Sequence, residues 1–121
     1  MKIQSSVMNS WLSLAEVQVF GVRATISNKA LFGVASRICD FELGFAWKAI
    51  NGNTDGDWVA GFTANKCQID FPWWQVDLGD IFKIIKILLW NCTDCCQDKL
   101  NSIVLQIIAC GRFHNCIVCQ F

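Results

Sequence analysis

The sequence has no excess charge of either sign, because ten Lys and Arg side chains balance ten Asp and Glu side chains. A balanced surface offers no basic field for nucleic acid or an anionic membrane, so no nucleic-acid partner is expected. No apolar run reaches the roughly eighteen residues that a membrane-spanning helix needs, since Lys83 and Lys86 interrupt the longest one. Membrane insertion is therefore not expected either.

Histidine is also scarce, because His114 is the only one in the chain. Cysteine-based catalysis would need a histidine base, which only this residue could supply. Together with Cys110, Cys116 and Cys119 it forms a soft ligand set near zinc-knuckle spacing. A zinc site is thus the alternative to disulfides or a disordered tail in this segment.

What the chain has in quantity is apolar side chains, at 54% of 121 residues, and eight cysteines. Its length fits one domain with a single core. So many cysteines favour an oxidising compartment, where disulfides persist. The first twenty residues, however, lack the continuous apolar stretch and cleavage site of a signal peptide.

The adjacent pair Cys95 and Cys96 lies in a polar, turn-like stretch. Neighbouring Cα atoms are about 3.8 Å apart, shorter than the roughly 4.4 to 6.8 Å of ordinary disulfides, so a bridge here would close a strained eight-membered ring. Two buried thiols, or two cysteines with different partners, are the alternatives.

Apolar alternation predicts a β-rich chain. Trp74, Val76 and Leu78 alternate with polar neighbours, so this strand buries one face and Trp73 points to the other. Residues 81–90 and 102–109 are rich in Ile, Val and Leu, and their length and β-branching favour strands over helices. Ile84-Ile85 and Ile107-Ile108 break strict alternation, which is typical of strands buried on both faces. Gly and Asn residues predict a loop at 51–57. The pattern as a whole predicts a β-sandwich of jelly-roll type.

Three ordered motifs resemble those of the fucolectins, the F-type lectin branch of the discoidin-like domains. They are Ala49-Ile50-Asn51-Gly52-Asn53, then Pro72-Trp73-Trp74-Gln75-Val76-Asp77-Leu78-Gly79, then Asn91-Cys92-Thr93-Asp94-Cys95-Cys96. The resemblance spans about residues 47 to 109. It implies an all-β, jelly-roll sandwich of discoidin type that is incomplete or permuted, and it implies secretion. Because His114 lies outside it, no enzymatic activity is expected.

The resemblance also implies a fucose site built from one histidine, two basic side chains and a vicinal disulfide platform. Aligned without gaps, the histidine position is Asn65, the first arginine is Cys92, and only Lys99 keeps its basic character. Asp94 is then free to pair with Lys99. Trp58 is the candidate aromatic platform, with simple packing as the alternative. The implied sugar-binding residues are Asn65, Cys92, Asp94, Cys95, Cys96, Lys99 and Trp58.

A calcium site beside the sugar loop is the second implication. Calcium takes six to eight oxygen ligands. By position these are the carbonyls of Lys48 and Phe62 and the side chains of Asn51, Asn53 and Glu16. Asn51 replaces an aspartate and so loses a charge. An ordinary polar turn is the alternative for the loop.

The ends of the chain do not follow the family order. Residues 1–21 resemble the last strand of a fucolectin domain yet come first, so they are expected to be the tail of a preceding repeat, a permuted last strand, or the product of a faulty gene model. Residues 22–109 form a partial F-type lectin domain, and residues 110–121 a Cys-rich tail outside the resemblance. Tandem repeats or a homo-oligomer are the expected assemblies.

Two functions therefore compete. The first is a secreted lectin module that binds fucosylated glycans, with Ca²⁺ as cofactor and an affinity weakened by the lost donors. The alternative is a degenerate structural or protein-interaction β-sandwich that has lost sugar binding.

Overall fold

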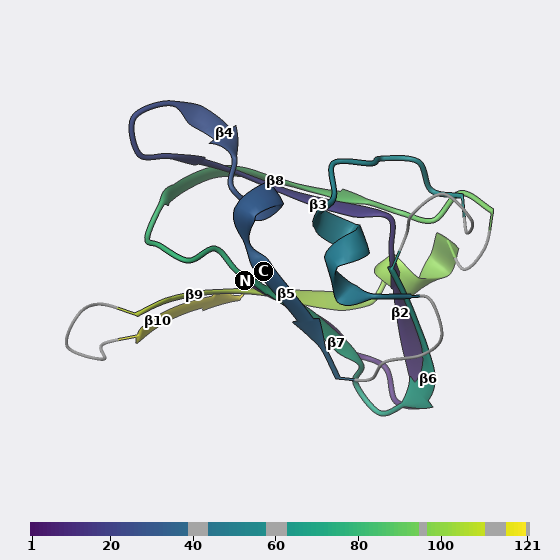
Figure 1. Ribbon diagram of the computed structural model, residues 1–121. Coiled ribbons are helices and arrows are strands. Elements are labelled where there is room, and N and C mark those ends of the chain that lie inside the picture. Colours follow the sequence, from purple (N-terminus) through teal and green to yellow (C-terminus); the bar gives the residue numbers. More distant parts are fainter. Residues whose placement is uncertain (39–43, 58–62, 95–96, 111–115, 121) are drawn as a thin grey trace.

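β-strands dominate the computed structural model, which describes residues 1–38, 44–57, 63–94, 97–110 and 116–120 (Figure 1). These residues contain three short 3-10 helices and no α-helix, so the all-β prediction is confirmed. The strands are β1 (Lys2–Ser5), β2 (Ser10–Leu14), β3 (Glu16–Val22), β4 (Ile26–Asn28), β5 (Val34–Arg37), β6 (Thr63–Ile69), β7 (Trp73–Asp77), β8 (Lys83–Trp90), β9 (Ile103–Cys110) and β10 (Cys116–Gln120). The helices are η1 (Ala30–Phe32), η2 (Ala46–Ile50) and η3 (Gln97–Leu100).

The strands form a sandwich of two layers. One layer is a five-stranded sheet in the order β10-β9-β1-β7-β5, and the other is a three-stranded sheet in the order β4-β3-β8 (Figure 1). Strands β2 and β6 pair with each other at one end. Fully buried side chains from both layers, among them Ile3, Val17, Val19, Trp74 and Val76, make up the core.

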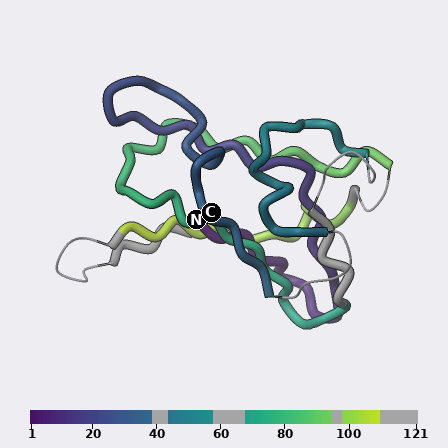
Figure 2. Tube along the Cα trace, viewed as in Figure 1, coloured from purple at the N-terminus to yellow at the C-terminus, as the bar shows by residue number. Residues whose placement is uncertain are grey.

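The N-terminal segment belongs to both layers. β1 lies between β9 and β7 in the five-stranded sheet, whereas β3 lies between β4 and β8 in the other (Figure 2). This segment therefore contributes strands and core side chains to the same folded unit as the rest of the chain. The origin of residues 1–21, as the tail of a preceding repeat, a permuted last strand or the product of a faulty gene model, stays a prediction.

The three predicted strands appear as β7, β8 and β9. In β8 the broken alternation at Ile84 and Ile85 has a local cause: Phe20 pairs with Lys86 and Gly21 with Ile84, so Ile85 has no partner in the ladder. The expectation that this break reflects burial on both faces is wrong, because Ile85 is a β-bulge and is exposed.

C-terminal residues 116–120 continue the five-stranded sheet. Cys116 pairs with Cys110, and Cys119 with Ile107, in antiparallel register. The backbone of this segment is therefore an edge strand rather than an irregular tail. His114 and the side chains of the three cysteines lie outside the described residues, so the zinc alternative stays untested.

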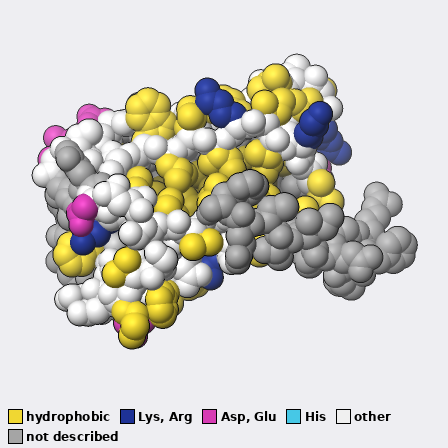
Figure 3. Space-filling model, turned by 180° about the vertical axis from the view of Figure 1, so that it is seen from behind, with side chains coloured by type: hydrophobic (Ala, Val, Ile, Leu, Met, Phe, Trp, Pro, Cys, Tyr) yellow, Lys and Arg dark blue, Asp and Glu magenta, His cyan; other side chains and the backbone are white. Residues whose placement is uncertain are grey.

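A cleft of about 430 Å³ lies between the layers on the side away from the small β2–β6 sheet. Apolar side chains from the β7–β8 connection, β8 and β9 line it, including Leu78, Phe82, Ile84 and Ile107. Viewed from behind, the molecule shows apolar side chains along the middle of this face (Figure 3). No helix among the described residues is long and apolar enough to span a bilayer.

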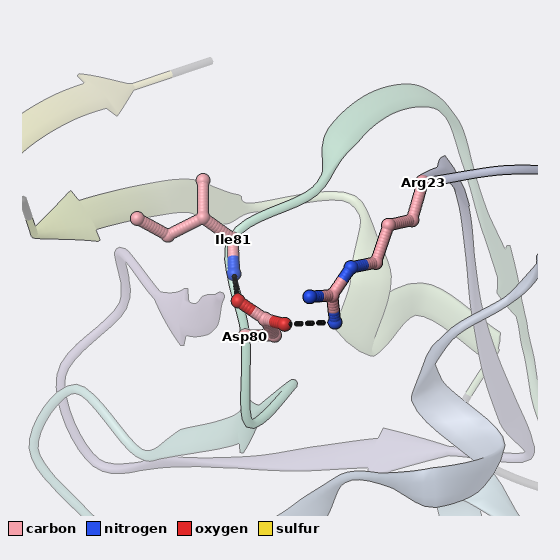
Figure 4. A network of polar contacts seen from close by, with 3 residues as sticks. All are labelled: Arg23, Asp80 and Ile81. Carbon is pink, nitrogen blue, oxygen red and sulfur yellow. Dashed lines mark hydrogen bonds and ion pairs between the residues drawn. The ribbon is translucent and has the colours of Figure 1, made fainter.

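An ion pair joins the β3–β4 turn to the β7–β8 connection. The Arg23 guanidinium contacts the Asp80 carboxylate, whose other oxygen accepts the Ile81 N–H at 2.7 Å (Figure 4). Both charged side chains are solvent-exposed. Exposed pairs contribute little to stability, so this contact restrains a loop and does not support the core.

Adjacent tryptophans in β7 have opposite environments, as the alternation predicts. Trp74 is 1% exposed, and its indole N–H donates to the Ala46 carbonyl at 3.0 Å, which ties β7 to η2. Trp73 is half-buried on the outer face, where the Lys2 ammonium lies 5.3 Å from its ring centroid.

We predict that Trp74→Leu lowers the free energy of unfolding by about 3 kcal/mol, because it leaves a cavity and an unpaired carbonyl. The matched change Trp73→Leu should cost below about 1 kcal/mol, since it removes an exposed cation–π contact. Urea unfolding of both variants measures the difference. Equal losses would contradict the assignment of the two faces.

Candidate functional site

Two loops meet at one end of the sandwich, next to the start of β3. Residues 51–57 follow η2, and residues 91–94 follow β8. The Thr93 N–H donates to the Gly56 carbonyl at 3.1 Å. A Cβ added at Gly56 would lie 2.7 Å from both the Asn91 carbonyl oxygen and the Thr93 nitrogen. The loops therefore pack backbone against backbone, and only glycine fits at position 56.

The 51–57 loop is ordered by its own side chains. The side-chain oxygens of Asn51, Asn53 and Asp55 accept the backbone N–H groups two residues onward, at 2.8, 2.9 and 3.0 Å. Such turns are what short amide and carboxylate side chains favour. The expected loop is confirmed, and its repeating contacts fix the positions of these three side-chain oxygens relative to the backbone.

Glu16 is the buried acid of this region. It begins β3, pairs with Trp90 at the end of β8, and is 0% exposed. Its Oε1 accepts the Gly52 N–H at 3.0 Å, while Oε2 is buried and has no hydrogen-bond partner among the residues that the structure describes. Burial raises the pKa of Glu16 to about 7, although the N–H groups of Gly52 and Asn51 lower it in part.

These contacts place three of the implied calcium ligands together. The Glu16 carboxylate reaches the backbone between Asn51 and Asn53. Lys48 lies one turn earlier in η2, and Phe62 lies outside the described residues. The chemistry of Oε2 fits a hard cation, which would offset the burial of the ionised carboxylate; without a cation, burial favours the protonated carboxyl, as the raised pKa of Glu16 indicates. Among the described residues no three His, Cys, Asp or Glu side chains form a metal-binding group, so amide and main-chain oxygens would complete the shell.

In the 91–94 loop, Cys92 points into the protein. It is 2% exposed, and its thiol donates to the Asp94 Oδ1 at 3.0 Å. Its backbone N–H donates to the Asn91 Oδ1 at 2.9 Å. The Cys92 side chain is therefore not presented to solvent, which the alignment with an arginine position did not reveal.

Lys99 lies in η3 and is held on two sides. Its ammonium is 3.1 Å from the Asp98 Oδ2 and 4.3 Å from the ring centroid of Trp11. The expected partner Asp94 is instead bonded to Cys92, and the ion pair that forms is with the sequence neighbour Asp98. Sequence reasoning missed Trp11, because no motif links β2 to a helix so far along the chain.

Other predicted site residues can be placed only in part. Asn65 lies in β6, where its backbone pairs with Leu12 of β2. Its side chain is not described. Trp58, Cys95 and Cys96 lie outside the described residues, so the vicinal disulfide and the aromatic platform stay predictions.

Comparison with known proteins identifies relatives. The family described as NedA-like, galactose-binding domain matches residues 48–118, more than half of the chain. This match extends past the expected boundary at residue 109. No solved structure is significantly similar.

Curated relatives match over shorter stretches. Fucolectin-1 of Anguilla japonica is 34% identical over 54 residues, which cover 45% of this chain and 30% of that protein. Fucolectin of Anguilla anguilla is 31% identical over 62 residues, covering 51% and 39%. Fucolectin-3 of Anguilla japonica is 32% identical over 80 residues, covering 62% and 44%. The chain thus spans less than half the length of each relative.

We predict that Gly56→Ala separates the two loops. Its Cβ would overlap backbone atoms, so unfolding free energy should fall by about 1 to 3 kcal/mol, and the Thr93 amide should exchange with solvent at least about tenfold faster. Hydrogen exchange followed by NMR measures this rate.

Gly79→Ala is the control. Gly79 has a φ of +78° and no atom within 4 Å of an added Cβ, so the change costs about 1 kcal/mol of backbone strain without touching the loops. Unchanged Thr93 protection in Gly56→Ala would show that the loops are not coupled at this contact.

Proposed function

This chain belongs to the family of NedA-like, galactose-binding domains, and from that premise we propose that it is a lectin module that binds fucose-type sugars beside a calcium site. The proposal includes secretion, fucosylated glycans as partners, and no catalytic activity. Tandem repeats or a homo-oligomer would compensate for weak single sites.

Likeness to relatives whose names identify them as fucolectins supports the sugar class. The family match covers both loops of the candidate site, since it spans residues 48–118. The eight cysteines fit an extracellular setting.

The contact between the two loops is the observation that carries the proposal. Gly56 joins the loop of amide and carboxylate oxygens to the loop that precedes Lys99. A hard-cation site and a polar sugar site can therefore be adjacent in this chain. Glu16, opposite Trp90, lies where the two loops converge.

A calcium ion would be held by Glu16, the side-chain oxygens of Asn51 and Asn53, and main-chain carbonyls. It would supply the positive charge that offsets the buried Glu16 carboxylate. This chain's own residues then fix the backbone: Gly52 donates to Oε1, and the turn contacts set the spacing of the loop oxygens.

Sugar hydroxyls would be bound mainly by Lys99, with Asn65 as a second polar group. An ammonium donates single hydrogen bonds, whereas the arginine that Cys92 replaces would present a planar fork. Each lost charge-assisted bond is worth about 1.5 to 3 kcal/mol. With Cys92 buried, the site has one described cationic donor, Lys99, and its affinity is accordingly low.

We predict that Ca²⁺ raises the melting temperature of the wild-type chain. At about ten times the Kd, linkage gives about 1.4 kcal/mol, which corresponds to a shift of several degrees. Glu16→Gln keeps an acceptor for Gly52 but removes the charge, so it should abolish the shift while the metal-free protein still unfolds cooperatively. Differential scanning calorimetry with Ca²⁺ and with EDTA measures both.

The control for the calcium experiment is Asp80→Asn, which removes an exposed carboxylate far along the chain from the loop. It should leave the calcium shift intact. A wild-type chain whose melting temperature is the same in Ca²⁺ and EDTA would remove calcium from the proposal.

We predict that immobilised fucose retains the wild-type chain and that free fucose elutes it at concentrations on the order of millimolar. Lys99→Gln should weaken retention by about tenfold or more, because it removes the charged donor. The exposed Lys83 of β8 gives the matched control, Lys83→Gln, with retention unchanged. Frontal affinity chromatography measures all three.

If a folded wild-type chain is retained on neither fucose nor galactose, the proposal that it binds sugar is wrong. The alternative, a structural or protein-interaction β-sandwich that has discarded its ligand, would then stand.

A further inference from the structure

The ammonium of Lys99 lies between an aromatic ring and a carboxylate that come from separate elements. Trp11 of β2 contributes the ring, 4.3 Å from Nζ to the centroid, and Asp98 of η3 contributes the carboxylate at 3.1 Å. Trp11 is half-buried, and the Lys99 side chain is only 21% exposed. The Lys99 side chain, of a type that is long and flexible, is thus mostly buried, and its ammonium is held by two partners.

The Trp11 contact is the closest of its kind in the described part of the chain. The other lysines over aromatic rings have Nζ at 5.2 to 5.9 Å from the centroid: Lys29 over Phe82, Lys2 over Trp73 and Lys86 over Phe20. Tryptophan has the strongest ring quadrupole, and partial desolvation strengthens the attraction. Of these four lysines, Lys99 is therefore the one whose ammonium is held most tightly by an aromatic ring.

The Lys99 ammonium keeps one N–H donor for a ligand. An ammonium has three N–H donors. One is directed to Asp98 and one face is turned to the Trp11 ring, and within the described side chains these are its two partners. The ammonium can still donate to a sugar oxygen without breaking either contact.

Placement in the fold links Trp11 to the rest of the site. Its neighbour Leu12 pairs with Asn65 in β6, the second polar position of the proposed site. The same segment continues into Glu16, beside the 51–57 loop. Trp11 therefore lies on a strand that contacts Lys99, pairs with the strand of Asn65 and leads directly into Glu16, one of the proposed metal ligands.

We propose that Trp11 is the positioning residue of the sugar site, which rests on the proposed function: its ring holds the Lys99 ammonium in the place where it donates to a neutral pyranose. Arginine keeps its donors aligned through its own planar group, whereas lysine has no such rigidity. In this chain the Trp11 ring restrains the Lys99 side chain. Less rotamer entropy of Lys99 is therefore lost when the sugar binds.

The test compares Trp11→Phe and Trp11→Leu with the wild type on immobilised fucose and galactose. Affinity should fall in the order Trp, Phe, Leu, within about threefold for Phe and by about tenfold for Leu, following the weakening ring quadrupole. Trp73→Leu, which removes the equivalent contact of Lys2 on the outer sheet face, is the matched control and should bind as the wild type does.

A spectroscopic readout separates positioning from general structure. The ε-methylene signal of Lys99 should be shifted upfield by the Trp11 ring current, should stay partly shifted in Trp11→Phe, and should return to its random-coil position in Trp11→Leu. Lysine-selective labelling, with Lys99→Gln for assignment, makes this signal observable. Trp11→Phe keeps the question answerable if the leucine variant fails to fold.

Each outcome of these experiments either supports or contradicts the positioning role of Trp11. A folded Trp11→Leu variant that binds like the wild type overturns the positioning role and leaves the proposed function standing. Loss of affinity with the Lys99 signal still shifted upfield also overturns it, because Trp11 would then act other than through Lys99. A wild-type chain that binds no sugar overturns both, whereas graded affinity that follows the Lys99 shift supports the inference.

Discussion

The burial of the Glu16 carboxylate is the constraint on which the functional end of this molecule depends. An ionised carboxyl in the interior is unfavourable unless donors or a cation compensate it. Gly52 compensates one oxygen and leaves the other without a donor. Glu16 contacts the 51–57 loop through Gly52, and its backbone pairs with Trp90, the residue before the 91–94 loop. A group that binds the second Glu16 oxygen therefore also restrains the position where the two loops leave the sandwich. The buried Glu16 carboxyl therefore couples the 51–57 loop to the 91–94 loop.

In the proposed sugar site, recognition depends on the fold around the 91–94 loop and not on that loop's own side chains. The Cys92 thiol points inward and bonds to Asp94. That contact stabilises the loop but offers nothing to a ligand. The remaining cation, Lys99, is held by Asp98 and by Trp11, a residue from another strand. Binding strength in such a site depends on how well the scaffold restrains one flexible side chain.

The fold was largely predictable from local pattern, and the site was not. Alternation around Trp74 and Val76 predicted both the strand and its buried face, because period-two burial depends only on sequence neighbours. The bulge at Ile85 was missed, since a bulge is defined by the partner strand and the partner here is β3. For the same reason Trp11 and the tight fit at Gly56 escaped detection: both contacts join residues distant in sequence, and no composition signal marks them. Cys92 was assigned to a sugar-binding position by alignment, and alignment carries no information on burial.

The N-terminal segment contacts Lys99 through Trp11 and the 51–57 loop through Glu16, from the two sides of the break at Ala15. β2 ends at Leu14 and β3 begins at Glu16, and between them the Ala15 N–H donates to the Trp90 carbonyl at 2.8 Å. This bond anchors the break, so Trp11 on one side and Glu16 on the other keep a fixed separation. The Lys99 ammonium and the 51–57 loop, which are far apart in sequence, are thereby both held against one short stretch of backbone. A chain without this stretch would lose both the aromatic partner of Lys99 and the carboxyl that accepts the Gly52 N–H.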